Sequence, residues 1–196
     1  MSVSSIMKKI ASAILGLAAA LLSGCIVTSV SPFYFEKDLA TDPALIGDWI
    51  RELKDKPSEV WKLEPLGTTG YRLTLIEERS ATVLEAHLFK LQGQLYLDLA
   101  SMDQDYHVIP PHYLLKITQL KPELRMAQID HDWLKDFVRK NPAAVRHHPV
   151  PVGNAPEERR VVLTGTTSEL QSFVTENLKA ENVWKGDFIL TRKNQK

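Results

Sequence analysis

The alternation of apolar and polar residues constrains the fold of this chain more than any other feature. From Leu45 onward apolar residues recur at every second position, as in Tyr71, Leu73 and Leu75, which are separated by Arg72 and Thr74. A period of two turns one set of side chains toward a core and the other toward solvent, as in a half-buried β-strand. The pattern predicts strands over residues 45–52, 58–65, 70–78, 81–92, 94–101, 112–121, 123–130, 160–165 and 186–192.

The connections between these runs are short. Gln92-Gly93 and Lys121-Pro122 lie between two pairs of strands, where tight turns are needed. Short connections favour antiparallel neighbours. We therefore predict a mainly β (α+β) domain, an antiparallel meander of about eight or nine strands that forms a barrel or a strongly bent sheet.

Two short helices are predicted to interrupt the strands. Asp130 can cap the first helix, which ends at Asn141-Pro142, and Thr166-Thr-Ser-Glu169 has the capping-box spacing that begins the second. The apolar residues of the two helices are Trp133, Leu134, Phe137 and Val138 in the first, and Leu170, Phe173, Val174 and Leu178 on one face of the second. Residues 141–158 contain four prolines and are predicted to form a long irregular loop, the least regular surface of the domain.

The first 24 residues divide as an export signal does. Lys8-Lys9 precede an apolar run over residues 10–22. This run is too short to span a hydrocarbon core, which needs about 20 residues, and it suits a secretory signal peptide. Leu22-Ser23-Gly24-Cys25 resembles the bacterial lipobox. The resemblance implies that the Cys25 thiol receives a diacylglyceryl group, that the peptide is cut before Cys25, and that the new amino group is acylated.

Two other interpretations of this segment are an ordinary cleavage site beside an incidental cysteine and an uncleaved anchor helix. We predict a lipoprotein signal peptide over 1–24, a lipidated cysteine and tether over 25–43, and a single β-rich domain over 44–196. Phe33-Tyr34-Phe35 in the tether either dip into the membrane interface or pack on the domain. The residue after the cysteine is Ile26 and not aspartate. This resembles the signal that sorts lipoproteins to the outer membrane, and it implies the periplasmic face of that membrane in a cell with two membranes.

Composition excludes several classes of partner and site. Removing residues 1–24 takes away two lysines and no acidic residue, so the mature charge is 22 − 24 = −2 with neutral histidines. No block of Lys and Arg follows the signal, so the electrostatic footprint of a nucleic-acid-binding protein is missing. Cys25 is the only cysteine, and lipidation consumes it, which leaves no thiol for a disulfide, a nucleophile or a metal.

The first predicted strand carries a resemblance to lipocalin-like barrels. Gly47-Asp-Trp49 resembles their Gly-x-Trp opening. The resemblance implies that Trp49 closes the barrel and that Arg192, late in the last strand, stacks on it. The Thr-Asp-Tyr motif of true lipocalins is missing, and a helix and a long loop precede the eighth predicted strand.

A second resemblance covers nearly the whole chain. The signal and lipobox, together with residues 31–49, 87–98 and 162–171, look like a family of uncharacterised bacterial lipoproteins. That resemblance implies a lipid-anchored envelope protein and no particular activity.

Few residues are candidates for chemistry. No Gly-x-Ser-x-Gly, glycine-rich phosphate loop, His-Glu-x-x-His or Cys-x-x-Cys is present. His147-His148 in the proline-rich loop are either zinc or copper ligands or exposed loop residues. His107 and His112 flank two prolines, with the same two interpretations, and His87 is either a hydrogen-bonded core or edge residue or a cavity-lining one. Asp103-Gln-Asp105 lacks the glycine and glutamate of a calcium loop and is read as a solvated turn. The sequence assigns no catalytic, cofactor or metal residue, only Cys25 as a lipid attachment site.

Three functions remain open at this stage. The first is a non-catalytic, lipid-anchored module that binds a hydrophobic ligand or an envelope partner, and it is the one we favour. The second is a cell-envelope hydrolase whose acidic and histidine residues are placed by the fold. The third is a structural or assembly lipoprotein. A packed interior favours an interaction protein, a large cavity favours a carrier, and a polar cleft favours an enzyme.

Overall fold

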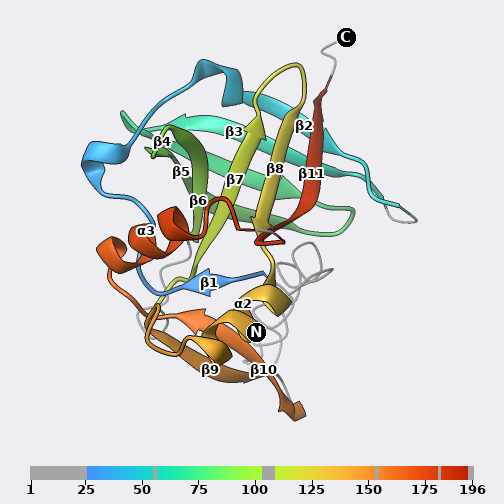
Figure 1. Cartoon of the computed structure of the whole chain (residues 1–196). Coiled ribbons are helices and arrows are strands. Elements are labelled where there is room, and N and C mark those ends of the chain that lie inside the picture. Colours follow the sequence, from blue (N-terminus) through green and yellow to red (C-terminus); the bar gives the residue numbers. More distant parts are fainter. Residues whose placement is uncertain (1–25, 55–56, 103–108, 153–154, 181, 194–196) are drawn as a thin grey trace, which may run out of the picture.

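The computed structural model describes residues 26–54, 57–102, 109–152, 155–180 and 182–193. Most of the regular structure is β (Figure 1). The strands are β1 (Thr28–Ser29), β2 (Gly47–Arg51), β3 (Glu59–Leu66), β4 (Gly70–Ile76), β5 (Ala81–Leu91), β6 (Gln94–Ser101), β7 (His112–Gln119), β8 (Leu124–Ile129), β9 (His147–Val152), β10 (Ala155–Leu163) and β11 (Trp184–Arg192). The helices are α2 (His131–Lys140) and α3 (Thr167–Glu176), with 3₁₀ turns at Glu36–Asp38 and Pro43–Leu45.

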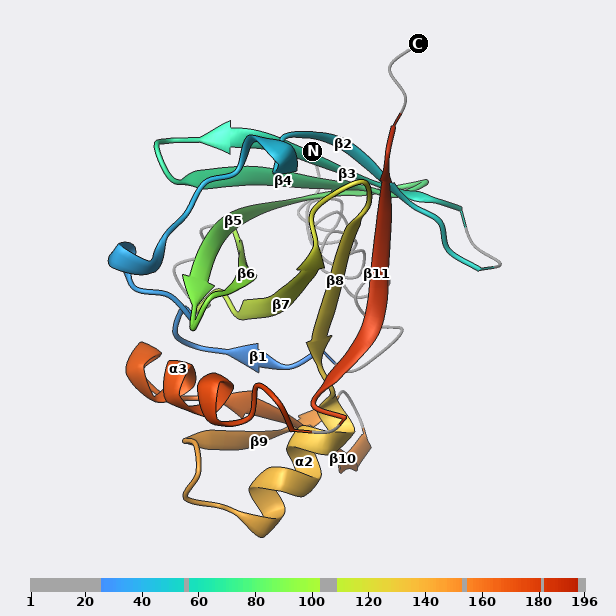
Figure 2. The same cartoon turned by 45° about the horizontal axis from the view of Figure 1, so that its top comes forward.

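Eight of the strands close into an antiparallel barrel. Strands β2 to β8 pair in sequence order, β8 pairs with β11, and β11 returns to β2 (Figure 2). The predicted meander and the lipocalin-like barrel are confirmed, and the alternative of an open bent sheet is not what forms. Gln92 and Gly93 have φ values of 50° and 82° at the β5–β6 turn. A two-residue type I′ hairpin turn requires positive φ at both of its central residues.

The barrel interior is occupied by the apolar half of the alternating pattern. One cluster of contacting side chains fills it, and its members are Leu45, Trp49, Trp61, Leu63, Tyr71, Leu73, Leu75, Leu84, Ala86, Leu88, Leu97, Leu99, Leu115, Ile117, Leu124, Met126, Phe188 and Leu190. The most exposed of them, Phe188, retains only 6% of its surface. An eight-stranded barrel is just wide enough either to be filled by side chains or to hold one small ligand. Two tryptophans, a tyrosine and many leucines make this one the filled kind.

Three further strands extend the sheet beyond the barrel. The first residues of β7, His112 and Tyr113, pair with β1, β1 pairs in parallel with β10, and β10 forms a hairpin with β9. We call β1, β9 and β10 the annex sheet. The prediction of an irregular loop over 141–158 is wrong in part, because residues 147–152 and 155–163 are strands. Edge position explains the error: β9 is the last strand of the sheet, and only an edge strand tolerates prolines at 149 and 151.

Both helices begin where the sequence predicts. The side chain of Asp130 accepts from the N–H of Trp133, and Thr166 and Glu169 form the capping box of α3. The two helices lie in front of β9 and β10 in Figure 2. They pack there on a second apolar cluster, which includes Val27, Leu114, Leu134, Val138, Val161, Leu163, Leu170, Phe173 and Val174. Among the described residues, no helix is long and apolar enough to cross a membrane.

The segment that enters the barrel is packed against the domain from its first described residue. Ile26 and Val27 retain 9% and 3% of their surface. Phe33 is buried at 1%, Tyr34 is half-buried, and Phe35 is 40% exposed. Of the two interpretations of the aromatic triplet, packing on the domain therefore holds for Phe33 and Tyr34.

Candidate functional site

The seam between β2 and β11 closes the barrel with an arginine stacked on a tryptophan. The guanidinium of Arg192 lies 4.0 Å from the ring centroid of Trp49. It donates hydrogen bonds of 2.5 Å to the carbonyl oxygens of Ile46 and Ala44. Gly47 has φ +125°, and a Cβ there would collide with this guanidinium. The predicted pairing of Arg192 with Trp49 is confirmed, and the glycine is the residue that leaves room for it.

A buried ion pair faces the barrel interior near that seam. Nη1 of Arg51 lies 3.3 Å from Oε2 of Glu59, whose side chain is 4% exposed. Nε1 of Trp61 donates to the same oxygen at 3.3 Å, and the guanidinium of Arg51 lies 4.3 Å from the ring centroid of Phe188. A buried charge is tolerated when it is paired and hydrogen-bonded. These polar groups therefore satisfy one another inside the protein.

Among the described residues, the most buried carboxylate on the outside of the barrel belongs to Asp98 on β6, which is 1% exposed. Its Oδ2 accepts the backbone N–H of Phe33 at 2.8 Å, and its Oδ1 lies 2.7 Å from Nδ1 of His112. Phe33 belongs to the entering segment, and His112 begins β7. Asp98 therefore fastens the entering segment to the outer face of the barrel, 65 residues away along the chain.

A second polar contact fastens the next residue of that segment. The hydroxyl of Tyr34 and Nδ1 of His87 are 3.0 Å apart, and their rings are 4.7 Å apart. Burial, together with the negative charges of Asp98 and Glu85, raises the pKa of Tyr34 to about 12. Tyr34 is therefore neutral at physiological pH. Of the two interpretations of His87, a hydrogen-bonded residue is the one that the structure shows.

A buried Asp–His pair is also a component of the catalytic triad of serine hydrolases. A triad further requires a serine hydroxyl that is hydrogen-bonded to the histidine, so the nearby serine must be considered. Ser29 is the cross-strand partner of His112. Its side chain is fully buried, and its hydroxyl donates to the carbonyl oxygen of Ser31 at 2.6 Å. The Ser29 hydroxyl proton is engaged by the carbonyl oxygen of Ser31, and both oxygens of Asp98 are engaged as well. The arrangement is suited to holding the entering segment in place.

The remaining predicted candidates do not come together. His147 and His148 lie on β9, where Nδ1 of His147 is 2.9 Å from the carbonyl oxygen of Val145. Among the described residues no three histidine, cysteine, aspartate or glutamate side chains gather as a metal site. Cys25, His107 and the pair Asp103 and Asp105 lie outside the described residues.

The sequence carried one overlooked signal for Asp98. After Gln94, the outward positions of β6 are Tyr96, Asp98 and Ala100, so a lone carboxylate stands between two apolar residues. Such a residue needs a buried partner. Its partners, a backbone amide and a histidine on other segments, could not be identified from the sequence.

No known protein family, no curated protein and no solved structure matches this chain.

Proposed function

We propose that this chain is a lipid-anchored bacterial envelope protein whose β domain is a non-catalytic interaction module for an envelope protein partner. The observation that carries the binding role is the filled barrel interior, with Trp49 and Trp61 each 1% exposed. Because side chains occupy the space a carrier would reserve for its ligand, recognition is assigned to the outer surface.

The anchor is proposed from the amino-terminal residues. A positive start, an apolar run and Leu22-Ser23-Gly24-Cys25 together supply an export signal and an acceptor thiol. Three acyl chains on Cys25 would make attachment effectively permanent, since one chain alone binds only marginally. The residue after Cys25 is Ile26, which supports the periplasmic face of the outer membrane in a cell with two membranes.

Intact mass spectrometry of the protein purified from membranes tests the anchor. We expect a chain that begins at Cys25 and carries the added mass of the acyl groups. Cys25→Ser should remain uncleaved and unacylated, whereas the matched variant Ser23→Ala, which keeps a small residue before the cysteine, should be processed normally. An unmodified Cys25 in the wild-type protein would overturn the anchor.

Native mass spectrometry and in-cell cross-linking test the module. We expect a cross-linked envelope protein to co-purify with the acylated chain and no small molecule to be retained. A hydrophobic molecule that remains bound after detergent exchange would contradict the filled interior and favour a carrier.

A further inference from the structure

The outward side of strands β2 to β5 forms a surface that the two helices leave uncovered. In Figure 2 the strands β2, β3 and β4 lie at the top of the molecule, whereas α2, α3 and β9 lie at the bottom. Because side chains alternate along a strand, the residues between those of the barrel interior point outward. We call this surface the outer sheet face, and its residues are Asp48, Ile50, Val60, Lys62, Glu64, Arg72, Thr74, Ile76, Ala81 and Val83.

One row of cross-strand partners on the outer sheet face is apolar. Ile50 pairs with Val60, and Val60 pairs with Ile76. Ile76 pairs in turn with Ala81, so the row crosses all four strands. Ile76 is 40% exposed, and Val83, the next outward residue of β5, is 41% exposed. A contiguous apolar row with polar residues beside it is typical of a protein–protein contact.

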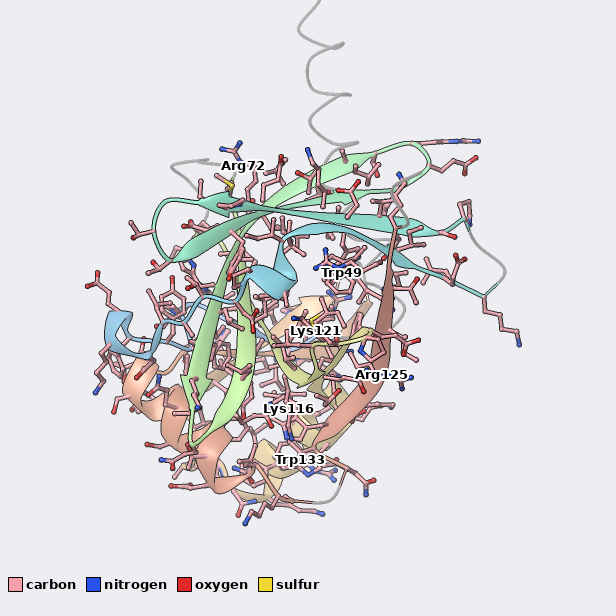
Figure 3. The ribbon with its side chains drawn as sticks, turned by 90° about the horizontal axis from the view of Figure 1, so that it is seen from above. Trp49, Arg72, Lys116, Lys121, Arg125 and Trp133 are labelled. Atoms are coloured by element: carbon pink, nitrogen blue, oxygen red, sulfur yellow. The ribbon has the colours of Figure 1, made fainter. Side chains whose placement is uncertain are left out.

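Charges of opposite sign stand on neighbouring strands of the same face. Glu64 on β3 and Arg72 on β4 are register partners. Oε1 of Glu64 lies 2.8 Å from Nζ of Lys62, which leaves the second carboxylate oxygen for another partner. Arg72 is exposed and forms no hydrogen bond or ion pair within the described part of the chain. Figure 3 shows it on the side of the molecule opposite Trp133 of α2, so its guanidinium is free to meet a carboxylate of a docked protein.

This arrangement of charged and apolar residues is complementary to itself. A symmetric dimer brings the same surface of two copies together around a two-fold axis. An axis that runs between β3 and β4, parallel to the strands, places Glu64 of each copy opposite Arg72 of the other. It also places Val60 of each copy opposite Ile76 of the other. The remaining opposed pairs are Ile50 with Ala81, Asp48 with Val83, and Lys62 with Thr74. No two like charges of the outer sheet face are brought opposite each other.

We propose that the outer sheet face binds a second copy of this chain in a symmetric dimer, with two equivalent salt bridges between Glu64 and Arg72 beside the apolar row. The inference goes beyond the proposed function, and it does not depend on the lipid anchor, because every residue of the interface belongs to the barrel.

The size of the face sets the strength of the dimer. Strands about 4.8 Å apart and outward residues about 7 Å apart along each strand give a face about 20 Å on each side. That is smaller than the surface that stable complexes bury, which is about 800 Å² per partner. We therefore expect a reversible dimer with a dissociation constant on the order of 10 μM.

Two complementary charge variants test the dimer. Glu64→Arg places two arginines opposite each other at both symmetric contacts, and Arg72→Glu places two glutamates there. In a mixed dimer of the two variants, each contact again joins an arginine to a glutamate. Native mass spectrometry of the full chain, released from detergent, distinguishes the mixed dimer from the two homodimers because the three differ in mass.

We expect the wild type to dimerise and each charge variant alone to dimerise about tenfold more weakly, because two exposed ion pairs become repulsive. An equimolar mixture of the two variants should recover the affinity of the wild type as the mixed dimer. A wild-type chain that stays monomeric at about ten times the expected dissociation constant would overturn the proposal. A dimer that both charge variants leave unchanged, or a mixture that forms no more mixed dimer than chance, would show that another surface is used.

Controls separate the interface from the fold. Lys135→Glu reverses an exposed charge on α2, far from the outer sheet face, and should leave dimerisation unchanged. Ile76→Ser removes an exposed apolar side chain without changing charge and should weaken the dimer about fivefold. Circular dichroism of each variant checks that the fold is retained. If cross-linking at position 83 instead captures a different envelope protein and never a second copy, this face belongs to that protein and the dimer is wrong.

Discussion

The closing seam of the barrel can be tested by a double-mutant cycle between Gly47 and Arg192. Arg192 stacks on Trp49 and donates to two backbone carbonyls, and Gly47 has a positive φ at the point where a Cβ would meet the guanidinium. Gly47→Ala should therefore do two things at once: strain the backbone and displace the arginine. Arg192→Ala removes only the arginine.

The two effects are of similar size. Charged hydrogen bonds and an exposed cation–π contact suggest that Arg192 contributes about 2 kcal/mol, after allowing for its exposure. An alanine held at a φ value that side chains rarely adopt is destabilised by about 2 kcal/mol. We therefore expect losses of about 2 kcal/mol for Arg192→Ala, about 4 for Gly47→Ala, and about 4 for the double variant.

Urea unfolding followed by tryptophan fluorescence measures these free energies, because Trp49 and Trp61 are buried in the native state. The diagnostic quantity is the coupling of about 2 kcal/mol between the two sites. Additive losses, with the double variant about 6 kcal/mol less stable, would refute the claim that the glycine exists to make room for Arg192.

Three other predictions follow from contacts outside the barrel. Asp98→Ala should lower the free energy of unfolding by about 3 kcal/mol and speed amide exchange at Phe33, whose buried N–H loses its acceptor; an unchanged exchange rate would contradict the fastening role. The pKa of Glu169 is lowered to about 2, first by the hydrogen bond from an arginine and then by those from its helix cap. A carboxyl whose pKa is lower in the folded state stabilises the protein above its ordinary pKa, and this stability is lost as the pH falls. The wild type should therefore lose stability between about pH 4.5 and 2. Glu169→Gln should lack this loss when the unfolding midpoint is measured across an acid titration. Replacing Pro149 and Pro151 together by threonine should promote self-association in analytical ultracentrifugation, because the edge strand β9 then regains N–H donors for a further strand; a variant that associates no more than the wild type would show that the prolines do not protect this edge.

The sequence was most informative where structure depends on near neighbours. Strand β6 was predicted over 94–101 and spans those residues, and both helix caps, Asp130 and Thr166, lie where their spacing placed them. Alternation and capping are local signals, set by which side of the backbone each residue occupies. Prediction failed over β9, because Pro149 and Pro151 indicate a loop unless the strand is known to be an edge.

The pair of contacts that fastens the entering segment was beyond any local signal. Asp98 shows as an isolated carboxylate on an apolar face, but its partners Phe33 and His112 lie on separate segments. The same holds for the annex sheet, because only the parallel pairing of β1 with β10 brings β10 beside the first described residues of the chain.

The sequence by itself therefore determined the strands of the barrel and the residues of its seam, since a period of two assigns each side chain to a face. It also predicts the attachment at Cys25. The tertiary structure alone decided which outer faces are covered, which buried charge meets which amide, and where the start of the chain emerges. These depend on pairings between segments far apart in the chain, and such pairings are selected by the packing of the whole domain.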